Sequence, residues 1–257
     1  MFERIADGYR GSTVVLVGCG GIGREIAVSL VDLAGSLVLI DHDSTAVEST
    51  RRWLEGLPQR SARLLSCTLD VRDAAQVQQR FRELRSELAV VDFLFYTAGV
   101  LTIEPFLETD TDDWRRSVEV NLNGAFYCVQ ACAGWMAERR HGSILLLGSI
   151  AGTRARSGSR VNPVYNATKA GIAAFVNSCA MQLRGSGVRI NSISPGPTAT
   201  AMMERQPPHV HEAVRQICLD HRMNSAAEVA ELALYVAAHG RFTGEDVAMG
   251  GGAGLGG

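Results

Sequence analysis

The chain has 257 residues, which is the length of one large domain. Hydrophobic residues make up 46% of it and charged residues 20%, as in ordinary globular proteins. The formal net charge of −2 argues against a nucleic acid or an anionic membrane as partner, because either would favour a basic excess. The 25 lysines and arginines include a single lysine, Lys169.

The sequence also argues against a membrane span, a secretion signal and a metal site. No apolar run reaches the roughly 20 residues of a spanning helix, and the mixed-charge N-terminus lacks the apolar core of a signal peptide. The histidines His209, His211 and His221 lie near two prolines and are interpreted as exposed residues rather than metal ligands. We therefore expect a soluble, cytoplasmic protein with reduced cysteines and no metal. The six cysteines are scattered without a Cys-x-x-Cys pair: Cys19, Cys67, Cys128, Cys132, Cys179 and Cys218.

Strand patterns and helix patterns alternate along the chain. In chain order the predicted elements are a strand at 13–17, a helix at 22–34, a strand at 37–40, a helix at 46–57, a strand at 63–67, a helix at 74–88, a strand at 90–96, a long helix at 112–139, a strand at 143–147, a helix at 164–184, a strand at 189–193, a helix at 226–238 and a short strand at 246–249.

The continuous apolar runs at 14–17, 37–40 and 144–147 indicate strands that are buried on both faces. Strands of this kind, alternating with helices, predict a doubly wound α/β Rossmann fold with a seven-stranded parallel sheet and helices on both faces. No internal boundary is visible, so we expect one dinucleotide-binding domain over 1–257. Six glycines at 250–257 predict a loose tail.

A glycine-rich turn directly follows the first predicted strand. It reads Gly18-Cys19-Gly20-Gly21-Ile22-Gly23 and opens the next helix, which fits the dinucleotide fingerprint G-x-G-x-x-G. Glycines there permit a tight turn and close approach to a pyrophosphate, and the helix N-terminus favours an anion. Such turns are common, so this motif alone is weak.

Asp41 ends the second predicted strand, 18 residues after Gly23. An acidic residue at this place binds the adenosine ribose hydroxyls of a dinucleotide, although it can also be a simple loop or capping acid. A carboxylate would repel a 2′-phosphate, and no basic residue lies inside the turn. The cofactor predicted is therefore NAD, with NADP less favoured.

Tyr165 and Lys169 lie one turn apart on the predicted helix 164–184 and so share a face. A tyrosine with an ordinary pKa near 10 is a poor base at neutral pH, and a neighbouring ammonium should lower that pKa. Lysine supplies a compact charge with three donors, which arginine does not replace cleanly. The pair by itself is a common pattern, but it holds the only lysine of the chain.

From about residue 10 to residue 252, the motifs and their order resemble the short-chain dehydrogenase/reductase family, in its single-domain branch. The matching segments, in family order, are the glycine turn, Asp41, Asp70-Val71, Ala98-Gly99, Val120-Asn121-Leu122-Asn123-Gly124, Gly148-Ser149, Tyr165 with Lys169, Pro195-Gly196-Pro197-Thr198-Ala199-Thr200, Glu228-Val229-Ala230 and Phe242-Thr243-Gly244.

The resemblance implies a catalytic set: Tyr165 as general acid/base, Lys169 as its partner, Ser149 as donor to the substrate oxygen, and Asn121 holding a water that relays protons. It also implies a cofactor cleft formed by Gly18, Gly20, Gly21, Ile22, Gly23, Asp41, Asp70, Val71, Ala98, Gly99, Tyr165, Lys169, Pro195, Gly196, Thr198 and Thr200. Taken one at a time, these residues could instead have purely structural roles: Ser149 at the end of a strand, Asn121 as a buried amide and Thr200 as a helix cap.

The chain departs from the family pattern at three places. Its glycine turn has Val17 where the family has threonine, and it is one residue shorter. Tyr96 and Thr97 stand where the family has two asparagines, which removes an amide that braces the sheet. The segment between Ser149 and Tyr165 is also longer than is common.

That longer segment carries Arg154, Arg156 and Arg160. One hypothesis is that an arginine binds an anionic substrate group; a solvated loop in an arginine-rich chain is the alternative we favour. Residues 201–221 fall where the family closes over its substrate, and Met202, Met203, Val210 and Ile217 are candidates to line an apolar pocket.

The predicted reaction is reversible oxidation of a secondary alcohol to a ketone with NAD, on a small-molecule substrate. The resemblance also implies a homo-oligomer, a tetramer or dimer, built partly on helices 112–139 and 164–184. Two alternatives remain open: an NADPH-dependent biosynthetic ketoreductase, and a dinucleotide-binding scaffold without turnover.

Overall fold

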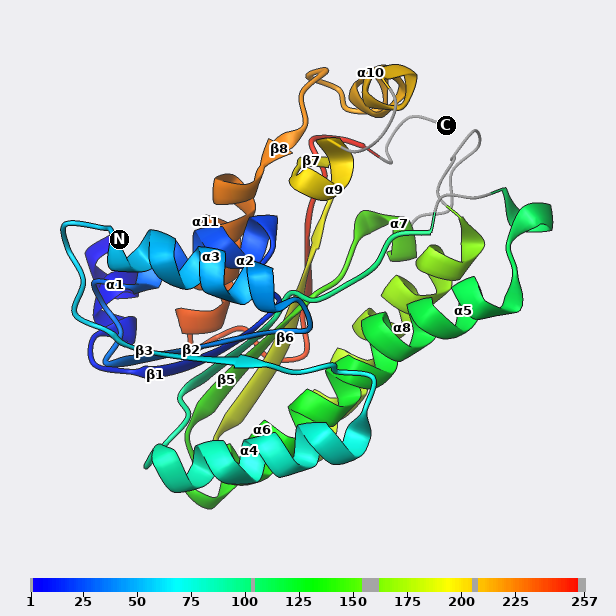
Figure 1. The fold of residues 1–257 in the computed structure, drawn as a ribbon. Coiled ribbons are helices and arrows are strands. Elements are labelled where there is room, and N and C mark those ends of the chain that lie inside the picture. Colours follow the sequence, from blue (N-terminus) through cyan, green and yellow to red (C-terminus); the bar gives the residue numbers. More distant parts are fainter. Residues whose placement is uncertain (1, 103–104, 154–161, 205–207, 254–257) are drawn as a thin grey trace.

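The computed structural model describes residues 2–102, 105–153, 162–204 and 208–253, and its centre is one parallel sheet (Figure 1). Seven strands pair in the order β3-β2-β1-β4-β5-β6-β9, every neighbour parallel to the next. The predicted doubly wound α/β fold is therefore confirmed. The strands are β1 (Thr13–Val17), β2 (Ser36–Asp41), β3 (Arg63–Thr68), β4 (Phe93–Tyr96), β5 (Gly142–Leu147), β6 (Val188–Pro195) and β9 (Asp246–Met249).

Helices cover both faces of the sheet, with α1, α2, α3 and α11 on one face and α4, α5, α6 and α8 on the other (Figure 1). The helices are α1 (Phe2–Tyr9), α2 (Gly21–Leu30), α3 (Ser44–Glu55), α4 (Ala74–Glu87), α5 (Thr111–Val118), α6 (Gly124–Glu138), α7 (Ile150–Thr153), α8 (Pro163–Gln182), α9 (Ala201–Glu204), α10 (Pro208–Gln216) and α11 (Ala226–Ala238).

The sequence of strand β1 is continuously apolar because the strand is covered on both faces of the sheet. Val15 and Val17 belong to the core beneath α4, α6 and α8, whereas Val14 and Leu16 belong to the core beneath α1, α2 and α11. All four side chains are buried, because successive residues of a strand point to opposite faces and both faces are covered.

The long predicted helix at 112–139 is present but is not uniform. Helix α5 passes through a π-helical turn at Glu119–Asn123 into α6. Helix α2 ends at Leu30 rather than residue 34, and the chain turns there to reach β2. Helix α1 was not expected; Tyr9 anchors it, because its buried hydroxyl donates to the Leu234 carbonyl oxygen at 2.8 Å.

A second, two-stranded parallel sheet joins two segments near the carboxyl edge of the large sheet. Strands β7 (Thr198–Ala199) and β8 (Asn224–Ser225) pair there, and the sequence pattern did not predict them. Within the described part of the chain, no helix combines the length and apolarity needed to cross a membrane.

Residues 250–253, the described part of the predicted loose tail, pack against the protein. Ala253 is buried with Ile150 and Cys218, and the Leu219 amide donates to the Gly251 carbonyl oxygen at 2.9 Å. Gly251 and Gly252 have positive φ angles of 57° and 73°, so glycine suits this turn for its conformation. The tail therefore begins as a packed turn.

Candidate active site

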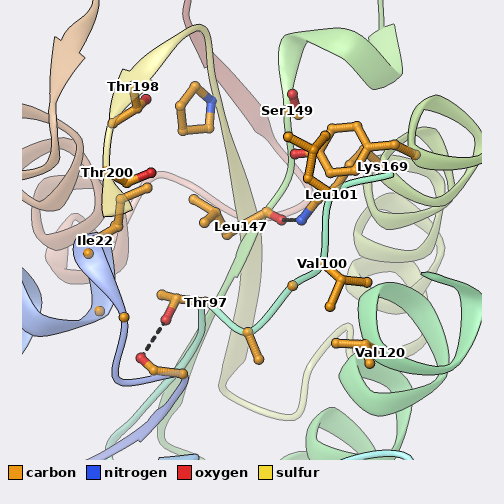
Figure 2. A pocket seen from close by; sticks show the side chains of 18 of the residues that line it. Ile22, Thr97, Val100, Leu101, Val120, Leu147, Ser149, Lys169, Thr198 and Thr200 are labelled. Atoms are coloured by element: carbon orange, nitrogen blue, oxygen red, sulfur yellow. Dashed lines mark hydrogen bonds between the residues drawn. The ribbon is translucent and has the colours of Figure 1, made fainter. Parts of the chain in front are cut away.

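A cavity of about 740 Å³ opens at the carboxyl edge of the sheet (Figure 2). Every predicted cofactor residue lines it, together with Ser149, Tyr165 and Lys169. Ligand sites in doubly wound sheets lie at this edge, where the strand order reverses between β1 and β4. Asn121 alone among the predicted site residues does not line the cavity.

Close packing accounts for three of the four glycines in the turn between β1 and α2. Gly18 has a φ angle of 103°, and a Cβ there would lie 2.5 Å from the Ala98 nitrogen. A Cβ on Gly23 would overlap the Gly18 carbonyl, and one on Gly21 would lie 2.9 Å from Thr200. A Cβ on Gly20 would meet nothing within 4 Å, so Gly20 borders open space in the cavity.

The shortened turn is held by side chains from two neighbouring strands. The Asp41 carboxylate accepts the Cys19 amide at 2.8 Å, and the Thr97 hydroxyl donates to the Gly18 carbonyl oxygen at 2.8 Å (Figure 2). Thr97, at a position where the family has asparagine, thus helps to hold the turn. Asp41 is both a structural acid of the turn and a cavity residue, so the two interpretations of it do not exclude each other.

The N-terminus of α2 is suited to an anionic group. No side chain caps it, because the N-cap residue is Gly20. The first N–H groups of a helix have no intrahelical partner, and the helix dipole favours negative charge there. Open space above Gly20 and these free donors fit the pyrophosphate of a dinucleotide.

Ser149, Tyr165 and Lys169 come together from β5 and α8. Ser149 follows β5, and its side chain lies close enough to Tyr165 to influence the pKa of the phenol. The Lys169 Nζ lies 5.8 Å from the centre of the Tyr165 ring and donates to the Leu147 carbonyl oxygen at 2.7 Å (Figure 2). The predicted pairing of Tyr165 and Lys169 on one helix face is therefore present.

Burial dominates the electrostatics of this pair. It lowers the pKa of Lys169 to about 8, because the ammonium is less well solvated than in water. Burial also raises the pKa of Tyr165, and the nearby Ser149 side chain opposes that rise. The sequence predicted that Lys169 would lower the pKa of Tyr165; in this structure desolvation is the larger effect, and the direction is the opposite.

Asn121 lies behind the cavity wall, in the π-helical turn, and is 1% exposed. Its Oδ1 accepts the Val100 amide at 2.8 Å, and its Nδ2 donates to the Val100 carbonyl oxygen at 3.0 Å and to Thr168 at 3.1 Å. A Cβ on Gly99 would lie 3.2 Å from the Asn121 Oδ1 and 3.5 Å from the Lys169 Nζ. The Asn121 amide and the Lys169 ammonium therefore both lie beside Gly99.

Comparison with known proteins settles the family. A family model described as enoyl-(acyl carrier protein) reductase matches residues 18–254. The chain belongs to the short-chain dehydrogenase/reductase family.

Three relatives of this short-chain dehydrogenase/reductase illustrate the match. Galactitol 2-dehydrogenase (L-tagatose-forming) of Cereibacter sphaeroides is 30% identical over 247 residues, 94% of each chain. The 2-dehydro-3-deoxy-L-rhamnonate dehydrogenase (NAD(+)) of Sphingomonas sp. (strain SKA58) is 27% identical over 234 residues, 90% of each chain. A crystal structure of a 3-oxoacyl-(acyl-carrier protein) reductase with bound NAD from Brucella melitensis has a TM-score of 0.83 and 30% identity, and covers 98% of this chain and 94% of that one.

Three further residues that line the cavity, His42, Arg72 and Arg116, were not among the predicted site residues. Arg72 donates to both carboxylate oxygens of Asp70, which lowers the pKa of Asp70, and His42 Nδ1 lies 2.9 Å from Asp41. The available signal was proximity in the sequence, since His42 directly follows Asp41 and Arg72 is two residues after Asp70.

Apolar side chains surround the end of the cavity near Ser149. Of the four candidates from the sequence, Met203 and Ile217 line it, as do Leu101 and Ile150. Val210 does not line it, and the Met202 side chain lies outside the described part of the structure. Arg154, Arg156 and Arg160 lie outside the described residues. Among the residues that the structure does describe, no three acidic, histidine or cysteine side chains are grouped as metal ligands would be.

Proposed function

We propose that this protein catalyses the reversible oxidation of a secondary alcohol to a ketone with NAD, using Tyr165 as the general acid/base. The observation that carries the proposal is the convergence of Ser149, Tyr165 and Lys169, with the ammonium over the tyrosine ring, inside the cavity that the glycine turn lines. Two hydroxyls that meet at one point can both contact a single substrate oxygen.

Tyr165 removes the proton of the substrate hydroxyl in the direction of oxidation and returns it in the direction of reduction. Ser149 donates to the substrate oxygen and orients it towards Tyr165. A substrate oxygen between the Ser149 and Tyr165 hydroxyls would therefore give each hydroxyl a partner.

Lys169 stabilises the phenolate form of Tyr165 by its charge. The contact with the Leu147 carbonyl uses one of the three ammonium donors, which leaves two for the hydroxyls of a cofactor ribose. Because burial brings the pKa of Lys169 to about 8, the residue holds its charge at neutral pH and can exchange a proton near that range.

The residues of the cavity fit a nicotinamide dinucleotide. The α2 N-terminus would hold the pyrophosphate, Asp41 the adenosine ribose, and Asp70 with Val71 the adenine, while Thr198 and Thr200 would line the nicotinamide end. The bound nicotinamide would supply the chemistry of hydride acceptance and donation. The carboxylate of Asp41 supports NAD over NADP, because it would repel a 2′-phosphate.

A panel of secondary alcohols and ketones, assayed with NAD(H) and NADP(H) in turn, tests the proposal. We expect turnover with a higher kcat/KM for NAD(H), and Asp41→Ala should reduce that preference because the repelling charge is gone. Preference for NADPH would favour the ketoreductase alternative. Measurable NAD binding without turnover on any substrate would favour the scaffold.

We further propose a homo-oligomer in the cytoplasm. Phe126 on α6 is 42% exposed and its ring lies 6.1 Å from that of Phe175 on α8, so the two long helices present aromatic surface together. Five cysteines, Cys19, Cys67, Cys128, Cys132 and Cys179, form no disulfide, which supports a reducing compartment.

A further inference from the structure

Tyr96, at the end of β4, is a buried side chain that the reaction does not use. It is 2% exposed, and its hydroxyl donates to the Val120 carbonyl oxygen at 2.6 Å. The family pattern has asparagine at this position, whose shorter side chain would not extend as far from the strand. The hydroxyl of Tyr96 therefore makes a contact that is a property of this chain.

The contact falls on the π-helical turn between α5 and α6. In a regular α-helix the Val120 carbonyl would accept the amide of Gly124, four residues later. Here the Gly124 amide donates to Glu119, five residues earlier. The Tyr96 hydroxyl donates to Val120 in place of that amide, so a side chain from the sheet supports the irregular turn.

Gly124 makes room for this arrangement. A Cβ there would lie 2.5 Å from the Tyr96 hydroxyl and 2.8 Å from a methyl of Val71. Tyr96 thus supplies the donor, and Gly124 leaves the space through which the Tyr96 hydroxyl reaches the helix.

The π-helical turn decides where Asn121 points. A π turn contains one residue more than an α turn, and one residue corresponds to a rotation of about 100° around the helix axis. With this turn in place, the Asn121 amide faces Val100 and Thr168. A return to regular α-helix would turn the side chain away from the wall beside Gly99 and Lys169.

We propose that Tyr96 is a positioning residue, whose hydroxyl holds the π-helical turn and so sets Asn121 against Val100 and Thr168 behind Lys169. The proposal rests on the proposed function for its effect on turnover, but not for its effect on the structure. Removing the hydroxyl leaves the Val120 carbonyl without this donor, and the Gly124 amide can then bond to Val120 in the α-helical way.

Tyr96→Phe tests this with Tyr9→Phe as the matched control. Tyr9 is equally buried and its hydroxyl also donates to a backbone carbonyl, but it lies in the core on the opposite face of the sheet. We expect Tyr96→Phe to lower kcat by about tenfold or more, with a smaller change in substrate KM, because misplaced catalytic groups slow the chemical step. Tyr9→Phe should keep the kcat of the wild type.

Two readouts in the cofactor-free protein report on the geometry directly. Hydrogen exchange at the Val100 amide, which donates to Asn121, should accelerate in Tyr96→Phe and not in Tyr9→Phe. Because the chain has one lysine, ¹³C-labelled lysine gives a single side-chain NMR signal. Its titration midpoint should move upward from about 8 in Tyr96→Phe, as the loosened wall admits water to Lys169.

Gly124→Ala offers an independent route to the same change, since its Cβ would displace the Tyr96 hydroxyl. Its control is Gly134→Ala on the same helix, where a Cβ meets nothing within 4 Å. Unchanged Val100 exchange and an unchanged lysine midpoint in both Tyr96→Phe and Gly124→Ala would overturn the proposal. If the wild type shows no turnover, the proposed function fails, and these two readouts still decide the role of Tyr96.

Discussion

Lys169 shows how much a single residue can reveal before a structure is known. The sequence holds one lysine among 25 basic residues, four positions after a tyrosine, and the structure places its ammonium 5.8 Å from the centre of that tyrosine ring. Spacing on a helix predicted the pairing. The pKa shifts were not predictable in the same way, because they depend on burial by β5 and the surrounding wall.

Replacing Lys169 by arginine should lower kcat by about 100-fold or more, although the charge is kept. The planar guanidinium is larger than an ammonium, and it must fit where Nζ now contacts the Leu147 carbonyl. Steady-state kinetics on the best alcohol substrate measure this. Arg63→Lys, the reverse exchange at an exposed position outside the cavity, is the control, and equal losses in both variants would contradict a specific role for Lys169.

The buried ammonium should also make stability depend on pH. Between pH 8 and the ordinary lysine pKa of 10.5, the folded protein releases the Lys169 proton while the unfolded chain keeps it, so stability rises with pH. The unfolding free energy of the wild type, relative to that of Lys169→Met, should therefore rise by on the order of 3 kcal/mol across this range. Urea unfolding of both proteins from pH 7 to pH 10 measures the difference; a constant difference would show that Lys169 is not desolvated.

Among the secondary-structure elements, the strands were predicted more closely than the connections between them. Apolar runs identify buried strands directly, but the π-helical turn in the long helix depends on Tyr96 from another strand and leaves no periodic signal. The shortened glycine turn likewise depends on residues from other parts of the sheet and leaves no periodic signal. Asp41, at the end of β2, and Thr97, directly after β4, support this turn, and these two strands lie beside β1 only in the folded sheet.

The close packing of α7 against α8 is expected to hold the Tyr165 and Lys169 side chains in place, and a substitution at their contact tests this. A Cβ on Gly152 would lie 2.5 Å from the Lys169 carbonyl carbon, so Gly152→Ala should force the two helices apart. We expect a loss of about 1–3 kcal/mol in unfolding free energy together with lower turnover. Gly134→Ala, in an open and exposed helical position, should instead leave the unfolding free energy unchanged or raise it by up to about 1 kcal/mol. Similar stability changes in the two variants would contradict the packing argument.

At the scale of the whole molecule, the parallel sheet and the edge that holds the site followed from alternation of elements alone. The segments around the cavity mouth did not, because α9, α10 and the β7–β8 pair are short and carry little periodicity. The packed turn at 250–253 was missed for a related reason: its glycines indicate flexibility by composition, whereas contacts with Ile150 and Leu219 order it.

The aromatic surface on α6 and α8 predicts the oligomeric state. We expect sedimentation velocity to show a dimer or tetramer for the wild type and mostly monomer for Phe126→Glu, because a carboxylate beside Phe175 would have to be buried without a partner. Trp53→Glu, an exposed aromatic on α3 at the other face of the sheet, is the control. A monomeric wild type, or an unchanged size in Phe126→Glu, would contradict this prediction.

The most direct test of the account is the turnover of Tyr165→Phe on an alcohol that the wild type oxidises. The variant removes one oxygen atom and keeps the ring beneath Lys169. We predict that kcat falls by about 10²- to 10⁴-fold, the usual contribution of a general acid/base, while NADH still binds with an affinity within a few-fold of the wild type. Wild-type turnover in Tyr165→Phe would contradict the central claim, because proton transfer would then not pass through this hydroxyl.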